Sequence, residues 1–182
     1  VQQWQDLSGN ANHANQATPA NQPIYRTNIV NTQPAMNFTG DTYIDAGSPG
    51  IAGDGGFTYF VVVEATSYAS GSTSDGSGDY IIDRTVDTNE LASLKVADTN
   101  KYGFQKRDNS GGGLGGPVTT TNINTSAFQM VDYMRNRGSN YQVYLNSTLE
   151  GTLSDSDGDL TPAATRIGRH QSIASAGLKG YI

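Results

Sequence analysis

The chain has 182 residues and no cysteine, and 11 basic against 17 acidic side chains give it a formal net charge of −6. This length suits one domain with a real core, and the missing cysteines exclude a disulfide scaffold, a cysteine-ligated zinc site and a thiol nucleophile. The acidic balance argues against duplex nucleic acid or an anionic membrane as partner, and no run approaches the roughly 20 apolar residues that cross a bilayer.

The composition is typical of an all-β domain with many loops. Only 15% of the residues are charged, whereas glycine occurs 22 times and tyrosine 10 times. Thr and Tyr favour the half-buried surface of a sheet, while Gly, Asn, Asp and Ser favour turns. Lys and Glu, which favour helices, are scarce. The sequence therefore predicts strands joined by polar loops, without a long helix.

Three predicted strands precede residue 68. Residues 34–38 and 43–45 alternate around Gly40-Asp41, which we interpret as a hairpin. Residues 57–65 form the longest β-branched and aromatic run, which predicts a central strand. A polar loop is expected at 14–23 and an exposed, low-complexity loop at 68–79.

The rest of the chain continues the pattern of short strands. Residues 128–136 fit a helix or a strand, but the hairpin that follows, turning at Asn146-Ser147, favours a strand. The further predicted strands are 80–84, 91–97, 102–107, 141–145, 149–153, 165–168 and 178–182, with a glycine-rich loop at 108–117. About a dozen strands at short spacing predict an antiparallel two-sheet sandwich.

Several motifs occur in an order that is similar to one family. They are WQDLSGNANHA at 4–14, PAMNFTGD at 34–41, FTYFVVV at 57–63, YQVYLN at 141–146, RIGR at 166–169 and LKGYI at 178–182. Together they resemble laminin-G-like, concanavalin A-like lectin/glucanase domains of the bacterial type. The resemblance covers nearly the whole chain and implies a single domain over residues 1–182, with a jelly-roll β-sandwich fold.

Two features depart from the family pattern. The family has Asn-Gly in the late hairpin, whereas here Ser147 follows Asn146. The family also continues past the Gly-Tyr-Ile stretch, whereas this chain stops at Ile182. We expect the chain to be a piece of a longer protein whose closing strand is missing or supplied elsewhere. An unpaired edge beside Tyr181 would then be adhesive.

The densest polar cluster lies near the start of the chain. Trp4, Asp6, Ser8 and Asn10 fit a structural turn, in which side chains bond to nearby backbone groups and Trp4 is buried at the start of a sheet. The alternative is that Trp4 is a platform on which a sugar ring stacks. The structural interpretation is the one that these residue types favour.

An acidic loop is the candidate metal site. Asp155, Asp157 and Asp159 stand at alternate positions, as carboxylates do in calcium loops, and calcium takes six to eight oxygen ligands. The glycine and glutamate that complete an EF-hand loop are absent. The alternative is a solvated turn without a metal. The family resemblance adds weight to calcium, since many relatives hold calcium beside a sugar site.

Candidate carbohydrate-binding residues lie in and beside the polar loops. The resemblance implies carbohydrate binding, and we assign it to Tyr68, Asp75, Asp79, Tyr102, Asp108 and Asn109. The tyrosines would stack on sugar rings, and the acidic and amide groups would bond to hydroxyls. For each tyrosine the alternative is an ordinary half-buried strand position.

No catalytic residues are predicted. The three glutamates, Glu64, Glu90 and Glu150, do not form the paired arrangement of sandwich glycosidases, and no nucleophile elbow accompanies a serine. The resemblance implies a non-catalytic recognition module of a secreted or surface-displayed protein that binds glycans, with or without calcium. The alternative is an assembly module of an adhesin, fibre or virion shell, which would contact a protein partner or a neighbouring subunit through its edge strands.

Overall fold

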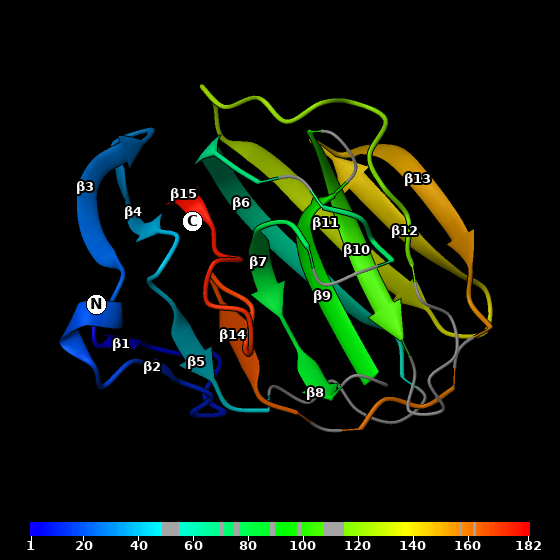
Figure 1. The fold of residues 1–182 in the computed structure, drawn as a ribbon, viewed down its shortest axis with the longest axis horizontal. Helices are drawn as coiled ribbons and strands as arrows, with labels where there is room; N and C mark the ends of the chain where they lie inside the picture. The colour runs from blue at the N-terminus through cyan, green and yellow to red at the C-terminus, as the bar shows by residue number, and fades with distance from the viewer. Residues whose placement is uncertain are drawn as a thin grey trace.

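The computed structural model is a two-layer β-sandwich with almost no helix (Figure 1). It describes residues 1–48, 55–69, 71–74, 77–87, 90–97, 100–107, 115–156, 158–161 and 163–182. A single 3-10 turn, η1, spans Pro19–Asn21. Every pair of neighbouring strands named below is antiparallel. The predicted fold class is confirmed.

Each layer is one sheet, and the chain passes repeatedly between them. The seven-stranded sheet has the order β13 (Thr148–Ser154), β12 (Asn140–Leu145), β11 (Gln129–Asn136), β6 (Phe57–Ser67), β15 (Lys179–Tyr181), β4 (Gln33–Thr39), β3 (Ile24–Val30). The eight-stranded sheet has the order β1 (Gln3–Trp4), β2 (Ala14–Asn15), β5 (Ile44–Ala46), β14 (Thr165–Ile167), β7 (Tyr80–Asp83), β9 (Glu90–Ala97), β10 (Lys101–Arg107), and β8 (Thr85–Asp87) also pairs with β9.

Strand β6 shows why the sequence forms a sandwich. Its residues alternate between the core and solvent: Tyr59, Val61 and Val63 are buried, whereas Phe60 and Val62 are exposed. A period of two places every second side chain on one face of a strand, so one face of β6 can be apolar and buried. Strand β11 alternates in the same way, which settles the choice between helix and strand for this segment.

The core joins the two sheets through aromatic contacts. The ring of Phe104, on β10, stacks on the ring of Tyr133, on β11, with ring centroids 3.3 Å apart and planes 6° apart. Both residues are fully buried. Because β10 and β11 belong to different layers, this stack holds the sheets together. Among the described residues, no helical segment has the length and apolar character of a membrane span.

The late hairpin accommodates Ser147 without a glycine. Asn146 and Ser147 have φ angles of 49° and 69°, the left-handed values that a two-residue hairpin turn requires. The Asn146 side chain also accepts a hydrogen bond from the backbone N–H of Met130 at 2.9 Å. A second hairpin, between β3 and β4, turns at Asn31 and Thr32 with similar angles and was not predicted from the sequence.

The predicted hairpin around Gly40-Asp41 is wrong. Strands β4 and β5 flank this dipeptide, but β4 belongs to the seven-stranded sheet and β5 to the eight-stranded sheet. Gly40 has a φ of +94°, and the backbone N–H of Thr39 donates to the Thr42 hydroxyl at 3.0 Å, so the chain turns out of one layer into the other. A glycine turn between two alternating segments has the same sequence pattern in both cases: when it joins two neighbouring strands of one sheet, and when it leads the chain from one sheet to the other.

Strand β15 lies inside the seven-stranded sheet. It pairs with β4 on one side and β6 on the other, so Tyr181 does not border an open edge. Tyr181 pairs with Asn37 on one side and Glu64 on the other, so the adhesive edge that would follow from a missing neighbour does not occur there. The edge strands of this sheet are β13 and β3.

Candidate functional site

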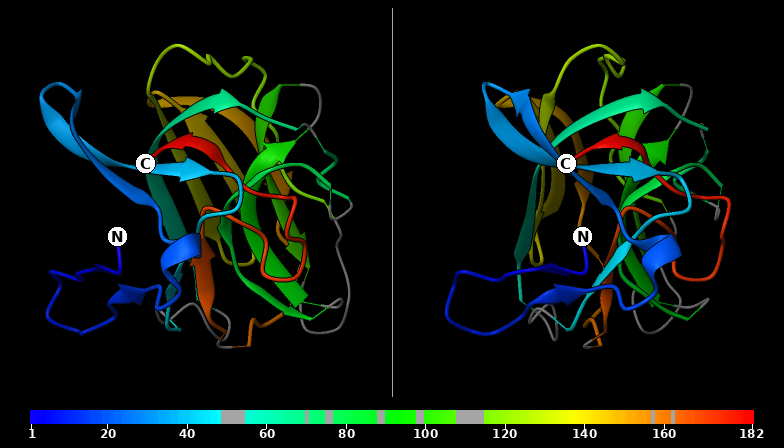
Figure 2. Two further views of the ribbon diagram at one scale, coloured as in Figure 1. Left: turned by 60° about the vertical axis from the view of Figure 1, so that its left-hand side comes forward. Right: turned by 90° about the vertical axis from the view of Figure 1, so that its left-hand side faces the viewer.

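A groove of about 240 Å³ opens beside the β3–β4 hairpin. Figure 2 shows the amino-terminal segment, with β1 and β2, extending below this hairpin, and both chain ends lie near the space between them. The lining consists of Val1, Gln3, Trp4, Gln5, Tyr25, Pro34, Ala35, Met36 and Ile182. These residues come from β1, β3, β4 and the carboxyl-terminal end, so only the folded chain brings them together.

The base of the groove is apolar and its rim is aromatic. Met36 and Ala35 are buried, at 6% and 5% exposed. Trp4 and Tyr25 are exposed at 43% and 59% although both carry large rings. Ligand sites combine a concave apolar surface with a few polar groups, and exposed aromatic side chains that line such a surface mark recognition sites.

Two amide side chains supply the polar groups of the groove. Gln3 and Gln5 flank Trp4 in sequence and also line the groove. The Gln3 amide nitrogen donates to the Asn15 side-chain oxygen at 2.9 Å, which fixes its direction. An amide carries both donors and acceptors, so it can bond to a neutral hydroxyl in either sense.

The turn that follows Trp4 is closed by side-chain hydrogen bonds. Asp6 accepts from the Ser8 backbone N–H at 2.8 Å, the Ser8 hydroxyl at 2.8 Å and the Asn12 N–H at 2.9 Å. The hydrogen bonds from Ser8 and then from Asn12 hold the pKa of Asp6 below its usual value. The Asn10 N–H donates to the Ser8 hydroxyl at 3.3 Å. Trp4, which was expected to be buried, stands at the groove instead.

The three described residues among the sequence-predicted sugar ligands do not line the groove. Tyr68 is half-buried and packs against the core. Asp79 is buried and accepts from the Ala69 N–H at 2.8 Å and from Lys179 at 3.2 Å. Tyr102 is fully buried, its hydroxyl donates to Gln129 at 3.4 Å, and burial raises the pKa of that hydroxyl. Asp75, Asp108 and Asn109 lie outside the described residues.

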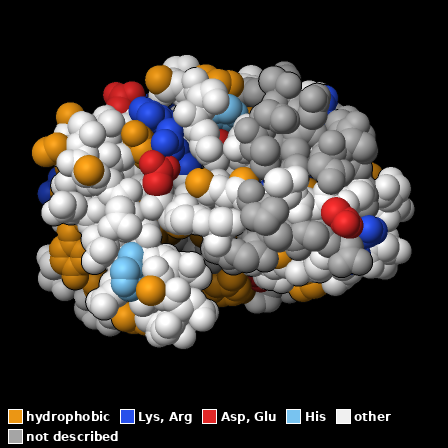
Figure 3. All heavy atoms as spheres, turned by 90° about the horizontal axis from the view of Figure 1, so that it is seen from below, with side chains coloured by type: hydrophobic (Ala, Val, Ile, Leu, Met, Phe, Trp, Pro, Cys, Tyr) orange, Lys and Arg blue, Asp and Glu red, His pale blue; other side chains and the backbone are white. Residues whose placement is uncertain are grey.

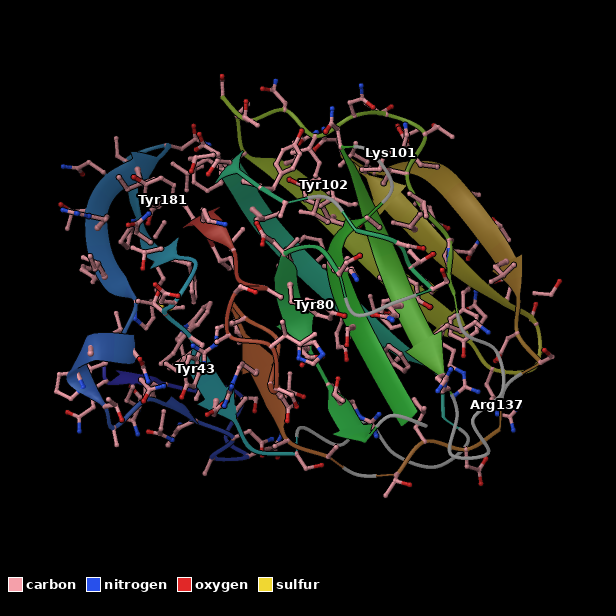
Figure 4. All side chains as sticks on the ribbon, viewed as in Figure 1. Tyr43, Tyr80, Lys101, Tyr102, Arg137 and Tyr181 are labelled. Carbon is pink, nitrogen blue, oxygen red and sulfur yellow. The ribbon has the colours of Figure 1, made fainter. Side chains whose placement is uncertain are left out.

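The burial of Tyr102 and Asp79 has a simple cause. Every residue of β7, which begins directly after Asp79, is buried, and so are the five central residues of β10, so both faces of these two strands are covered. Figure 4 labels both Tyr80, which is buried on β7, and Tyr102, which belongs to the hydrophobic core. A tyrosine beside a loop in the sequence can therefore lie in the core, and a Tyr102 ring at 0% exposure is not a surface on which a sugar could stack.

The acidic loop divides into a buried and an exposed part. The Asp155 carboxylate accepts from Arg135 Nε at 3.0 Å and from the Gly138 N–H at 3.0 Å, and both side chains of the ion pair are fully buried. Asp159 is exposed and lies 3.5 Å from Arg137. Asp157 lies outside the described residues.

This arrangement does not by itself provide a calcium site. The described part of the loop offers one exposed carboxylate, Asp159, which is paired with Arg137, against the six to eight oxygens that calcium takes. Within the described ranges, no three His, Cys, Asp or Glu side chains gather closely enough to hold a metal ion. Calcium at this loop stays a prediction.

A second polar cluster lies around Tyr80, inside the eight-stranded sheet. The Tyr80 hydroxyl donates to Gln105 at 2.6 Å, Lys95 lies 3.3 Å from the same hydroxyl, and the His170 ring meets the Tyr80 ring edge-on at 4.5 Å. All four side chains are buried. Because these polar groups are paired with one another, the cluster has the character of a structural network.

The end of the molecule seen in Figure 3 is mixed in character. Basic and acidic side chains lie next to one another on the side of β3 to β5, and the hydrophobic side chains form separate small groups. Arg166, on β14, forms an ion pair with Asp45, on β5, at 2.7 Å. The guanidinium groups of Arg166 and Arg169 both pack on the ring of Tyr43, at 3.8 and 4.2 Å.

Solved structures with a similar fold include two bacterial modules and a laminin region. Domain 4 of AbnA, an extracellular GH43 arabinanase from Geobacillus stearothermophilus solved with arabinotriose, has a TM-score of 0.64 at 13% identity over 88% of this chain and 71% of that chain. The CBM40 of the Ruminococcus gnavus IT-sialidase, bound to α2,3-sialyllactose, has a TM-score of 0.61 at 13% identity over 87% of this chain and 88% of that chain.

The LG1-3 region of the laminin α2 chain has a TM-score of 0.58 at 14% identity. The match covers 81% of this chain and 29% of that region. The fold is that of the laminin-G-like sandwiches. The resemblance inferred from the ordered motifs is thereby confirmed at the level of fold. No family model and no curated protein sequence matches the chain.

Proposed function

We propose that this chain is a non-catalytic carbohydrate-binding module and that its glycan lies in the groove between Trp4 and Tyr25. The observation that carries the proposal is the pair of exposed aromatic rings on a concave apolar surface, with the amides of Gln3 and Gln5 beside them. The apolar face of a sugar ring packs on an aromatic side chain, while its hydroxyls need neutral donors and acceptors.

The size of the groove supports a small ligand. Its volume of about 240 Å³ is slightly below the usual range for drug-sized ligands, so it would hold one or two sugar units of a longer glycan. The similar domains from the arabinanase and the sialidase were both solved with oligosaccharides, which supports the same ligand class here. By the same likeness to an extracellular arabinanase and to laminin, we place the protein outside the cell.

The single tryptophan makes the groove directly observable. Trp4 is the only tryptophan in the chain, so fluorescence excited at a wavelength that tryptophan absorbs and tyrosine does not reports on the groove alone. We expect a glycan array to identify a binding glycan, and titration of that glycan to change Trp4 fluorescence in a saturable way. Tyr25→Ala should weaken binding by about tenfold, the loss of a good stacking contact.

The matched control is Phe60→Ala, which removes an equally exposed ring from β6, away from the groove. This variant should bind the glycan as the unmodified chain does. The proposal would be overturned if no glycan on the array bound the protein. It would also be overturned if Tyr25→Ala left the affinity for the identified glycan unchanged. Repeating the titration with calcium and with a chelator tests whether the Asp155–Asp159 loop assists, since a bound cation that favours the complex must raise the affinity.

A protein-binding role is the second candidate function. It is favoured by a separate observation, the exposed apolar side chains of β6 and β13, where Phe60 and Leu149 are 62% and 47% exposed. Large apolar side chains exposed on one sheet are typical of surfaces that contact a protein.

A further inference from the structure

The outer face of the seven-stranded sheet presents an ordered row of side chains. Asp132 on β11 lies directly opposite Phe60 on β6 and Tyr144 on β12, and Tyr144 in turn lies opposite Leu149 on β13. Directly opposite residues in an antiparallel pair point to the same side with Cβ atoms about 5 Å apart. One carboxylate therefore stands between two aromatic rings. We call Phe60, Asp132 and Tyr144 the central row.

Apolar side chains surround the central row. Met130 and Met134 precede and follow Asp132 on the same face of β11, because residues two apart share a face. Val62, opposite Met130, is 39% exposed, and Phe60 is 62% exposed. The sheet face around Asp132 thus carries apolar side chains that reach solvent, and the polar Thr58 and Gln142 lie opposite Met134.

The Asp132 carboxylate lacks a partner in this environment. Its Oδ1 atom is shielded from solvent by its neighbours and has no hydrogen-bond partner among the described residues. Burial raises the pKa of this carboxyl above its usual value, since desolvation disfavours the charged form. A shielded acceptor without a donor is costly. A donor from outside reaches Oδ1 once the flexible side chains of Met130 and Met134 on the same face move aside, and it then removes that cost.

We propose that the central row is a docking site for an arginine side chain of a partner protein, with the surrounding methionines, Val62 and Leu149 contacting apolar residues of that partner. The guanidinium donates hydrogen bonds to the Asp132 carboxylate and packs against the rings of Phe60 and Tyr144. This role goes beyond glycan binding in the groove and does not depend on it.

Arginine fits the row better than the other cationic or polar groups. A guanidinium is planar, weakly hydrated, stacks on aromatic faces and donates two parallel hydrogen bonds to a carboxylate. A lysine ammonium is compact and strongly hydrated, so it gains less from the rings. A quaternary ammonium has no N–H with which to satisfy Oδ1. Strands β6 and β12 are two strand spacings apart, about 10 Å, which leaves room for one flat group between the rings.

Charge and surface character indicate a basic protein partner. The chain carries a net charge of −6, which opposes association of two copies and attracts a cationic partner. The apolar side chains around the row come from three strands: Val62 from β6, Met130 and Met134 from β11, and Leu149 from β13. None of these residues lines the groove, and an open sheet face suits a protein surface better than a small ligand, which requires a concave site.

The three methionines allow both sites to be followed in one experiment. Met36 lines the groove, whereas Met130 and Met134 flank Asp132, and the chain has three methionines in all. We would label the methionine methyl groups with carbon-13 and record their NMR signals while adding the peptide acetyl-Leu-Arg-Leu-amide. The comparison peptide has citrulline, which is neutral and nearly the same shape, in place of arginine.

The expected result is a saturable shift of the Met130 and Met134 signals with the arginine peptide and a fixed Met36 signal. Asp132→Asn or the citrulline peptide should weaken the interaction by about tenfold, and added salt should weaken it further. Phe60→Ser, at an exposed position, is the second variant and should also weaken binding, while Tyr25→Ala should leave it unchanged.

Three results would overturn the inference. They are an absence of Met130 and Met134 shifts at millimolar peptide, equal shifts with the citrulline peptide, and a shift of these two signals on addition of the groove's glycan. The last result would assign the central row to sugar. If the groove did not bind glycan, the Met36 NMR signal and the Trp4 fluorescence would stay unchanged when glycan is added. The failures of the two proposals are therefore distinguishable.

Discussion

Asp155 shows how one side chain can look like a metal ligand and serve as the partner of a buried cation. Arg135 points into the sandwich from β11, and its guanidinium is fully buried against the Asp155 carboxylate. A buried ion pair stabilises little relative to apolar residues, but removal of one partner leaves an uncompensated charge in the interior. The acidic loop is therefore tied to the core at one end.

We expect Asp155→Asn to lower the free energy of unfolding by about 3–5 kcal/mol, because Arg135 loses its counter-charge in a buried site. Chemical denaturation of the two proteins measures this difference. The matched control is Asp159→Asn, which breaks the exposed pair with Arg137 and should cost less than about 1 kcal/mol. Equal effects of the two variants would contradict the assignment of Asp155 to the core.

His170 is a buried neutral base. Its Nδ1 atom accepts hydrogen bonds from the backbone N–H groups of Ser172 and Ile173 at 2.9 and 3.0 Å, so that nitrogen carries no proton. Burial is the main cause that lowers its pKa below 6.5, opposed by Asp83 and helped by Lys95 and Arg166.

We expect the free energy of unfolding to decrease as the pH falls below about 6.5. In that range the unfolded chain binds a proton at this histidine and the folded chain does not, so acid favours unfolding. His170→Asn keeps a side-chain acceptor and cannot titrate. Thermal melts between about pH 7.5 and pH 5 should therefore show a smaller decrease for this variant. A pH dependence identical to that of the unmodified chain would refute the role of His170.

At the scale of the element, β15 completes the seven-stranded sheet. It lies between β4 and β6, with a register shift next to Gly180. A Cβ atom at Gly180 would lie 1.9 Å from the carbonyl oxygen of Glu64 on β6. The strand can approach β6 this closely only because it has a glycine at that position.

We expect Gly180→Ala to lower the free energy of unfolding by about 1–3 kcal/mol, because β15 must move away from β6. The comparison is Gly47→Ala, where an added Cβ would meet nothing within 4 Å and where stability should change little. Urea denaturation of both variants gives the two differences. If both variants unfold like the unmodified chain, β15 does not pack against β6 as described.

At the scale of the whole molecule, the two proposed sites occupy different parts of the sandwich. The groove lies where the amino-terminal segment meets the β3–β4 hairpin, and the central row lies on the outer face of β6, β11 and β12. None of the residues of the central row lines the groove. The two proposals are therefore compatible, because the proposed glycan and the proposed protein partner would contact different residues.

The sequence by itself determined the layers of this protein. The alternating side chains of β6, β11 and β12 predict strands with one buried face and one exposed face, and the Asn146-Ser147 turn predicts the hairpin. Both predictions need only residues that are close in sequence. The same local signal also placed Asp132 between two methionines on one face of β11. The residues opposite Asp132, Phe60 and Tyr144, could not be predicted, because the sequence of one strand does not specify which other strands pair with it.

Only the tertiary structure decided what lies at each surface. Trp4, Tyr25 and Met36 meet in one groove although they are separated along the chain, and Tyr102 is buried although it borders a predicted loop. The turn at Gly40-Asp41 crosses between layers instead of closing a hairpin. The physical reason is common to all three: burial and sheet pairing depend on long-range packing, whereas the period of the sequence fixes only which side chains share a face.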